Sequence, residues 1–294
     1  MAKGTVLQKL FGLRPPSTLY KYFAPERIDV LQNGKIRFSQ PPVFNDPFES
    51  APAFLELVSP KNLEIASRIE AERSGMPEEM RKAMVNRFSS APYRNELMKT
   101  LGPLFIDTLV RTVGLLSLTE KYDNLLMWAH YAKSHEGFVI GFKTADPFLW
   151  HEDAKPHAAN SLMKVRYSRR RPKLKFLSEV GLAEMYFTKS KEWAYEQEWR
   201  MFATMPSEDA GQMLESALAS IAESGKPTAT PDYPIRLFNF PPSAVSRVIV
   251  GCRASDETSK AVASIVNKKY RDAELLKAER DLSEFHLILR PLSK

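Results

Sequence analysis

The spacing of hydrophobic residues changes twice along this chain and divides it into three parts. Before residue 53 and after residue 112, short segments alternate between apolar and polar residues or are apolar throughout, as strands do. Between 53 and 112 the apolar residues recur at helical spacing among many charged residues. We therefore expect a helical insertion at 53–112. Strands and helices do not alternate regularly elsewhere, which favours the α+β class over a doubly wound sheet.

The individual elements follow from the same pattern. The predicted strands are residues 18–23, 35–39, 113–119, 138–143, 163–167, 235–239, 245–251 and 287–292. The predicted helices outside the insertion are 25–33, 125–132, 255–270 and an excursion at 207–224. Pro291 cannot donate a hydrogen bond to a neighbouring strand, so the last strand should lie at a sheet edge. Because the first and last strands need a common sheet, we expect one domain at 18–294, preceded by an N-terminal arm at 1–17.

Composition narrows the classes of function. The chain has 294 residues, one cysteine and no apolar run long enough to span a bilayer. We therefore expect a cytoplasmic protein without disulfides and without a membrane partner. Its five histidines show no metal-ligand spacing, so no metal is expected. The sequence also has no Walker A loop and no dinucleotide-binding glycine motif.

A cluster of basic residues occupies 164–175 and surrounds Tyr167. Its candidates for contact with nucleic acid are Arg166, Arg169, Arg170, Arg171, Lys173 and Lys175. The net charge of +7 is compatible with a polyanionic partner but does not require one. A nucleic-acid or phosphate surface and a solvated loop both remain open as interpretations of this cluster.

The stretch 191–202 (KEWAYEQEWRMF) holds the strongest candidates for chemistry. From Ala194 onward its alternation predicts a strand with Glu196, Glu198 and Arg200 on one face. Glu196 and Glu198 would then lie about 7 Å apart at the usual rise per residue. Two close carboxylates should raise the pKa of at least one of them, unless Arg200 or a ligand offsets the repulsion. The alternative is a solvated strand face with an internal ion pair.

Two other segments could line a pocket. The loop 40–49 is held irregular by its prolines and presents Asn45 and Asp46, either as a pocket wall or as an Asx turn over the core. The segment 122–131 concentrates aromatic and polar residues, among them Trp128, His130 and Tyr131. These suit either an aromatic pocket for a flat ring or an aromatic-rich core helix.

Four segments together resemble a known bacterial family. They are LYKYF (19–23), FNDPFE (44–49), LLMWAHYA (125–132) with EGFVIGF (136–142), and YEQEWR (195–200). Their order and spacing resemble the family catalogued as "domain of unknown function twenty-nine seventy-one". The resemblance covers roughly residues 18–292.

The order of elements resembles, more distantly, that of ADP-ribosyltransferases. This resemblance implies a split, mainly antiparallel sheet, and NAD as the substrate. It implies that Glu198 stabilises the oxocarbenium-like ribose and that Glu196 orients or deprotonates the acceptor. The residues expected at NAD are Tyr20, Lys21, Tyr22, Asn45, Asp46, Ser117, Trp128, His130, Tyr131 and Arg200. Lys21 departs from the histidine or arginine usual at its position.

Three functions are therefore in view. The first is an NAD-dependent ADP-ribosyltransferase that modifies nucleic acid as a toxin or phage-defence effector and is restrained by an antitoxin or another regulatory protein. The second is a non-catalytic module that binds nucleic acid or protein. The third is a nuclease-like hydrolase using Asp46, Glu196, Glu198 and a lysine. The first requires Glu198 and the aromatic residues of 122–131 to share one pocket.

Overall fold

The computed structural model describes residues 14–52, 54–56, 75–90, 110–149, 162–175, 179–204, 233 and 235–292, with short pieces between 92 and 107. Most of the predicted arm at 1–17 and the whole excursion at 207–224 lie outside the described residues. In the described part of the predicted insertion, α4 (Glu78–Ser89) is a helix. The insertion does not begin as a helix, however. Phe54–Glu56 forms strand β3, paired in parallel with β8 (Lys173–Lys175).

In the described part of the chain, eight strands form one sheet in the order β14-β13-β12-β5-β1-β4-β10-β6. They are β1 (Thr18–Phe23), β4 (Val113–Thr119), β5 (Phe138–Lys143), β6 (Met163–Lys164), β10 (Glu198–Thr204), β12 (Val245–Val250), β13 (Glu274–Arg280) and β14 (Leu287–Pro291). Every neighbouring pair is antiparallel except β12 and β13. A mixed helix-and-strand protein with a mostly antiparallel sheet was predicted, and β14 is an edge strand as expected.

Shorter elements surround this sheet. The helices are α2 (Asp29–Asn33), α6 (Leu125–Tyr131), α7 (Glu179–Phe187) and α9 (Asp256–Lys269), and the 3-10 turns are η1 (Pro25–Arg27), η2 (Pro41–Val43), η3 (Pro147–Leu149), η4 (Lys191–Glu196) and η5 (Pro242–Ala244). Strand β2 (Lys35–Phe38) pairs with β11 (Arg236–Asn239), and β7 (Arg166–Ser168) pairs with β9 (Thr188–Ser190). Gly34 ends α2 in the left-handed conformation that a C-terminal glycine adopts readily.

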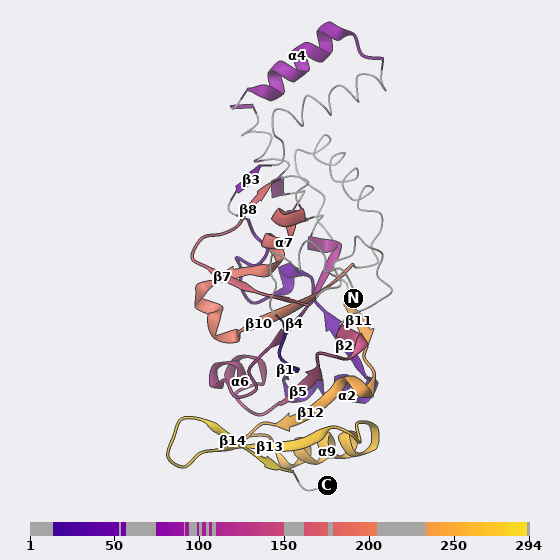
Figure 1. Cartoon of the computed structure of the whole chain (residues 1–294), viewed down its shortest axis with the longest axis vertical. Coiled ribbons are helices and arrows are strands. Elements are labelled where there is room, and N and C mark those ends of the chain that lie inside the picture. Colours follow the sequence, from indigo (N-terminus) through magenta and orange to yellow (C-terminus); the bar gives the residue numbers. More distant parts are fainter. Residues whose placement is uncertain are drawn as a thin grey trace.

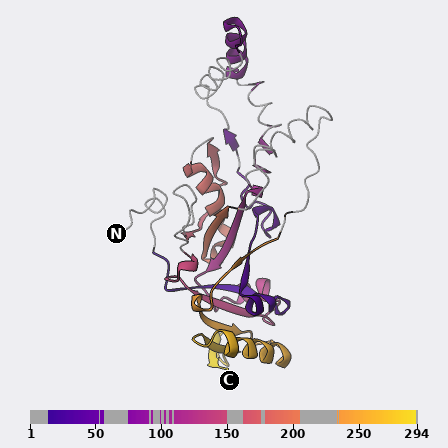
Figure 2. The same cartoon turned by 90° about the vertical axis from the view of Figure 1, so that its right-hand side faces the viewer.

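The alternation of the strands separates the core into clusters on opposite sides of the sheet. Leu19 and Phe138 point into the largest cluster, which also holds Val262 of α9. Tyr22 and Val139, from the same two strands, belong to a second cluster with Trp128 of α6. Helix α9 and strands β13 and β14 lie at the end of the molecule opposite α4 (Figure 1 and Figure 2).

The sheet opens between β1 and β4. Strand β1 pairs with β5 over six residues but with β4 only at Tyr20 and Thr119. Beyond this point β4 bridges to Ser39 through Leu115, and the Lys21 ammonium donates across the opening to the Ser117 carbonyl at 2.9 Å. The polar groups at the opening therefore face a space between two strands, which is where a ligand can approach them.

One sequence prediction fails at the centre of the chain. The strand expected from Ala194 begins only at Glu198, because Lys191–Glu196 forms the 3-10 turn η4. Gln197 then adopts a left-handed conformation, with φ at 44°. This residue breaks the alternation, so Glu196 and Glu198 do not share a face as alternate residues of one strand.

Candidate functional site

A cavity of about 440 Å³ lies at the opening between β1 and β4. Strands β2, β9 and β10, helix α6, the turns η1 and η4 and the loop after β2 also contribute to its wall. Its lining residues are Tyr20, Lys21, Tyr22, Phe23, Ala24, Arg27, Arg37, Ser39, Val43, Phe44, Asn45, Asp46, Glu49, Leu115, Ser117, Leu118, Thr119, Met127, Tyr131, Lys189, Glu196, Glu198 and Arg200. Its volume is in the range typical of small-molecule sites.

Arg200 is the centre of a buried ion-pair network. Its guanidinium is fully buried and donates to both carboxylate oxygens of Glu198, at 2.7 and 2.9 Å. Its Nη1 donates to Glu49 Oε1 at 2.6 Å and to the Tyr186 carbonyl at 2.5 Å. All four of these hydrogen bonds go to protein groups, so Arg200 holds the site together.

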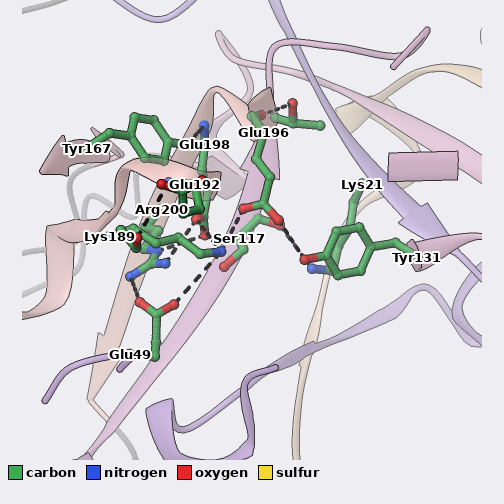
Figure 3. Close-up of polar contacts among 12 residues, drawn as sticks. Lys21, Glu49, Ser117, Tyr131, Tyr167, Lys189, Glu192, Glu196, Glu198 and Arg200 are labelled. Carbon is green, nitrogen blue, oxygen red and sulfur yellow. Dashed lines mark hydrogen bonds and ion pairs between the residues drawn. The ribbon is translucent and has the colours of Figure 1, made fainter. Parts of the chain in front are cut away.

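Lys189 is a second buried cation in the network, and the sequence analysis did not single it out. Its ammonium donates to Glu196 at 2.6 Å and lies 3.4 Å from Glu198 and 3.9 Å from Glu49 (Figure 3). The ring of Trp193 lies beneath it, with the nitrogen 4.7 Å from the ring centre. Two cations and three carboxylates therefore occupy one end of the cavity.

These contacts determine the protonation of the carboxylates. Burial alone would raise the pKa of Glu198, but Arg200 and Lys189 outweigh it and lower that pKa to about 2. At Glu49 the balance is reversed: burial raises its pKa, and Arg200 only partly offsets this effect. The repulsion expected from the sequence is therefore offset by Arg200 at Glu198, as that prediction allowed, with Lys189 as an additional cation.

Glu196 has more free hydrogen-bonding capacity than Glu198. The Tyr131 hydroxyl donates to its Oε1 at 2.6 Å, and Lys189 donates to its Oε2. Burial and the neighbouring Glu196 raise the pKa of Tyr131, so this phenol stays a proton donor. Each carboxylate oxygen can accept about two hydrogen bonds, which leaves Glu196 able to accept from a ligand in the cavity.

Two polar residues hold Tyr131 and Glu196 opposite each other. Asn124 caps α6 by accepting from the backbone of Leu126 and Met127, and its amide donates to the Tyr195 carbonyl at 3.1 Å. Thr119 of β4 donates its hydroxyl to the Glu196 carbonyl. The start of the helix and the end of the 3-10 turn are thereby tied to the same strand end.

The cavity contains most, but not all, of the residues predicted to bind NAD. Tyr20, Lys21, Tyr22, Asn45, Asp46, Ser117, Tyr131 and Arg200 line it, together with Glu196 and Glu198. Trp128 lies fully buried beneath Tyr22, edge to face, and donates its indole nitrogen to the Tyr122 carbonyl. His130 is exposed and does not line the cavity. Of the 122–131 segment, Tyr131 and Met127 share the pocket with Glu198.

Asp46 satisfies both interpretations of its loop. Its Oδ1 accepts from the Phe48 backbone at 2.9 Å, as an Asx turn requires, and the residue also lines the cavity. Its Oδ2 is buried without a hydrogen-bond partner among the described residues.

The part of the cavity wall that η1 and β2 form holds two cations that the sequence analysis did not single out. Arg27 and Arg37 line it together with Lys21. No local motif marks either arginine, because each lies alone in a short element. Arg37 alternates with the apolar Ile36 and Phe38. This pattern indicates a cavity residue only once the position of β2 beside the cavity is known.

The basic cluster adjoins the site through Tyr167. The Tyr167 hydroxyl accepts from the Glu198 backbone at 2.8 Å. Arg166, Arg169, Arg170, Arg171 and Lys173 are exposed, and Arg171 also donates to the carbonyls of Ala51 and Pro52. The side chain of Lys175 lies outside the described residues.

The structure thus defines a mixed helix-and-strand protein with a charged network at an opening in its sheet. The model of the family described as "Protein of unknown function (DUF2971)" matches residues 127–201 of the chain. That segment contains Tyr131, Lys189, Glu196, Glu198 and Arg200. No curated protein and no solved structure matches the chain, so the ADP-ribosyltransferase resemblance stays a prediction.

None of the described helices is both long and apolar enough to cross a membrane. No group of three or more His, Cys, Asp or Glu side chains in the described part of the chain is arranged to hold a metal ion.

Proposed function

We propose that this protein is an NAD-consuming ADP-ribosyltransferase whose active site is the cavity between β1 and β4. The observation that carries the proposal is Glu196: a carboxylate only 3% exposed, held by Tyr131 and Lys189, that lines the cavity with hydrogen-bonding capacity to spare. A buried, oriented anion of this kind stabilises the positive charge that develops on a ribose during glycosidic cleavage. The opening of the sheet at this point also supports the resemblance to transferases with a split sheet.

The contacts favour a division of roles between the two glutamates that differs from the one expected. Glu198 accepts both arms of Arg200 and also lies against Lys189, so its charge is already neutralised. We therefore assign the reactive role to Glu196 and a positioning role to Glu198. In the reaction, the bond between ribose C1 and the nicotinamide nitrogen breaks, and nicotinamide leaves with the bonding pair. The acceptor then bonds to C1, and its proton passes to Glu196.

We propose nucleic acid as the acceptor. The exposed Arg166, Arg169, Arg170 and Lys173 supply positive charge suited to a phosphate backbone. Tyr167, within this segment, contacts the Glu198 backbone, so an acceptor bound to the cluster would lie beside the cavity. A toxin or phage-defence role, with a restraining partner protein, remains a prediction that follows from this choice of acceptor.

The test is titration calorimetry with NAD, in parallel with a nicotinamide-release assay. Glu196→Gln keeps the shape of the side chain and removes its charge. We expect NAD affinity within a few-fold of the original and nicotinamide release lowered about 100-fold or more. Glu192→Gln is the matched control, because Glu192 is an exposed carboxylate of the same 3-10 turn that does not line the cavity. We expect it to behave as the unmodified protein does.

The opposite results identify the alternatives. A folded protein that neither binds nor cleaves NAD contradicts the transferase. Salt-sensitive binding of nucleic acid that persists in Glu196→Gln would then indicate a binding module. The nuclease-like alternative is less well supported, because Lys189 and Arg200 already occupy the carboxylates that would hold a divalent ion.

A further inference from the structure

Positive charge gathers on the side of the cavity that β1, η1 and β2 form. Lys21 comes from β1, Arg27 from η1 and Arg37 from β2, and all three line the same cavity. They reach it because the chain turns twice within about twenty residues, through η1 and α2, and returns as β2. In β2, Ile36 and Phe38 point into the main core, so the alternation of the strand directs Arg37 to the other face.

These cations have few protein partners. Arg37 Nε is buried and makes no hydrogen bond to any described residue. The Lys21 ammonium donates to one backbone carbonyl, that of Ser117. Arg27 pairs with Asp29 at 3.1 Å, but its side chain is 42% exposed and the pair is open to water. Buried polar atoms are normally hydrogen-bonded, so an unpartnered guanidinium nitrogen at a cavity indicates a missing acceptor.

The repulsion of Lys21 and of Arg37 by Arg27 supports the same conclusion. Burial lowers the pKa of Lys21 to about 8, and the charge of Arg27 adds to this effect while Glu198 opposes it. Burial also lowers the pKa of Arg37, and Arg27 again contributes. Like charges that destabilise one another in the free protein are stabilised when an anion binds between them.

We propose that Lys21, Arg27 and Arg37 form a subsite for a phosphate or diphosphate group. A guanidinium matches phosphate geometry with two parallel hydrogen bonds, and a lysine adds a compact charge. The phosphate chemistry follows from the three cations alone. The identity of the whole ligand, a diphosphate-linked nucleotide that also reaches Glu196, rests on the proposed function.

The test compares four probes by titration calorimetry: inorganic phosphate, pyrophosphate, ADP-ribose and adenosine. Binding of phosphate or pyrophosphate would show that the site recognises the anion by itself. Binding of adenosine would show that affinity does not require an anion. We expect pyrophosphate and ADP-ribose to bind at least tenfold more tightly than adenosine. Arg37→Gln should weaken both by about 10- to 100-fold, since it removes a charged hydrogen-bond donor. Because Arg27 is more exposed, Arg27→Gln is a second variant with less risk to folding, and it should weaken them in the same direction.

Arg280→Gln is the matched control. Arg280 is an exposed arginine at the end of β13 that does not line the cavity, and its loss should leave all four affinities unchanged. Equal affinity for ADP-ribose in the unmodified protein and in folded Arg37→Gln and Arg27→Gln overturns the subsite. If phosphates bind through Arg37 while NAD is not cleaved, the subsite stands and the transferase fails. If NAD is cleaved with an unchanged KM in Arg37→Gln, the transferase stands and the subsite fails.

Discussion

At one end of the cavity Lys189 and Arg200 lie against three carboxylates, whereas Lys21 and Arg37, on the side formed by β1 and β2, make no ion pair with any described residue. The side chains of Lys189 and Arg200 are at most 8% exposed, and Lys21 and Arg37 are half-buried. A buried charge that is fully paired contributes to a fixed geometry, and removing its partner is costly. A buried charge without a partner costs stability in the free protein and can recover it from a ligand. The paired cations, Lys189 and Arg200, therefore position other protein groups, whereas the cations without an ion pair, Lys21 and Arg37, are suited to bind a ligand.

The largest expected effect comes from a matched pair of substitutions, one at each end. Arg200→Met leaves Glu198 and Glu49 buried without their main counter-ion, so we expect a loss of about 3–5 kcal/mol in the free energy of unfolding. Arg37→Met removes a cation that Arg27 already disfavours, so its effect should stay within about 1 kcal/mol. Urea unfolding at neutral pH measures both. Equal losses would mean that the two ends do not differ in the way the contacts indicate.

The second prediction concerns acid stability. The pKa of Glu198 is about 2 in the folded protein and 4.5 as the ordinary value. Between these values the unfolded chain binds more protons than the folded chain, so stability should fall as the pH is lowered from about 4.5 to 2. Glu49, whose pKa is raised, acts in the opposite direction and reduces the net effect.

In Glu198→Gln this source of pH dependence is absent. The variant should be less stable than the unmodified protein at neutral pH, and its stability should change less between pH 4.5 and 2. Urea unfolding across this range is the measurement, with the exposed Glu192→Gln as control. A slope that is the same in all three proteins would contradict the pairing of Glu198 with Arg200 and Lys189.

The third prediction tests the cationic end through pH. Lys21, with a pKa of about 8, faces Arg27, Glu196 and Glu198. An anion binds the protonated amine, so affinity for ADP-ribose should weaken as the pH rises through and above about 8, by up to about tenfold per unit. Lys21→Arg keeps its charge over this range, and its affinity should be nearly constant. Calorimetry from pH 7 to 10 distinguishes the two. A flat profile in the unmodified protein would exclude Lys21 from the subsite.

The parts of this structure that sequence could predict are those governed by local pattern. The runs 18–23, 113–119 and 138–143 became β1, β4 and β5 with the expected bounds, because their aliphatic, aromatic and β-branched residues are typical of strands that are buried over most of their length. The pocket loop was also recognised, since its prolines exclude regular structure. Strand β13 (ELLKAER) was missed, because its charged and apolar residues fit neither period.

The charged groups of the site could be predicted only in part. Glu196, Glu198 and Arg200 stand close in sequence, and their spacing draws attention. Lys189 and Arg37 carry no such indication, because only the pairing of distant strands brings them to the cavity. Helical spacing likewise cannot say which face of α6 meets the sheet, so Trp128 and Tyr131 looked equivalent until one proved to be core.

The smallest expected effect concerns Gln197, whose conformation gives the carboxylate end its geometry. A glutamine in the left-handed region costs roughly 1 kcal/mol, and glycine removes this cost at some expense in chain entropy. Gln197→Gly should therefore change the free energy of unfolding by less than about 1 kcal/mol and leave nicotinamide release unchanged.

Gln197→Val should lower the free energy of unfolding by about 1–2 kcal/mol or more, because a β-branched residue tolerates a positive φ poorly. It should also lower nicotinamide release, since relieving the strain moves Glu196 away from Glu198. Thermal unfolding and the release assay test both variants. A Gln197→Val protein as stable and active as the original would show that the left-handed residue does not place the two glutamates in one cavity.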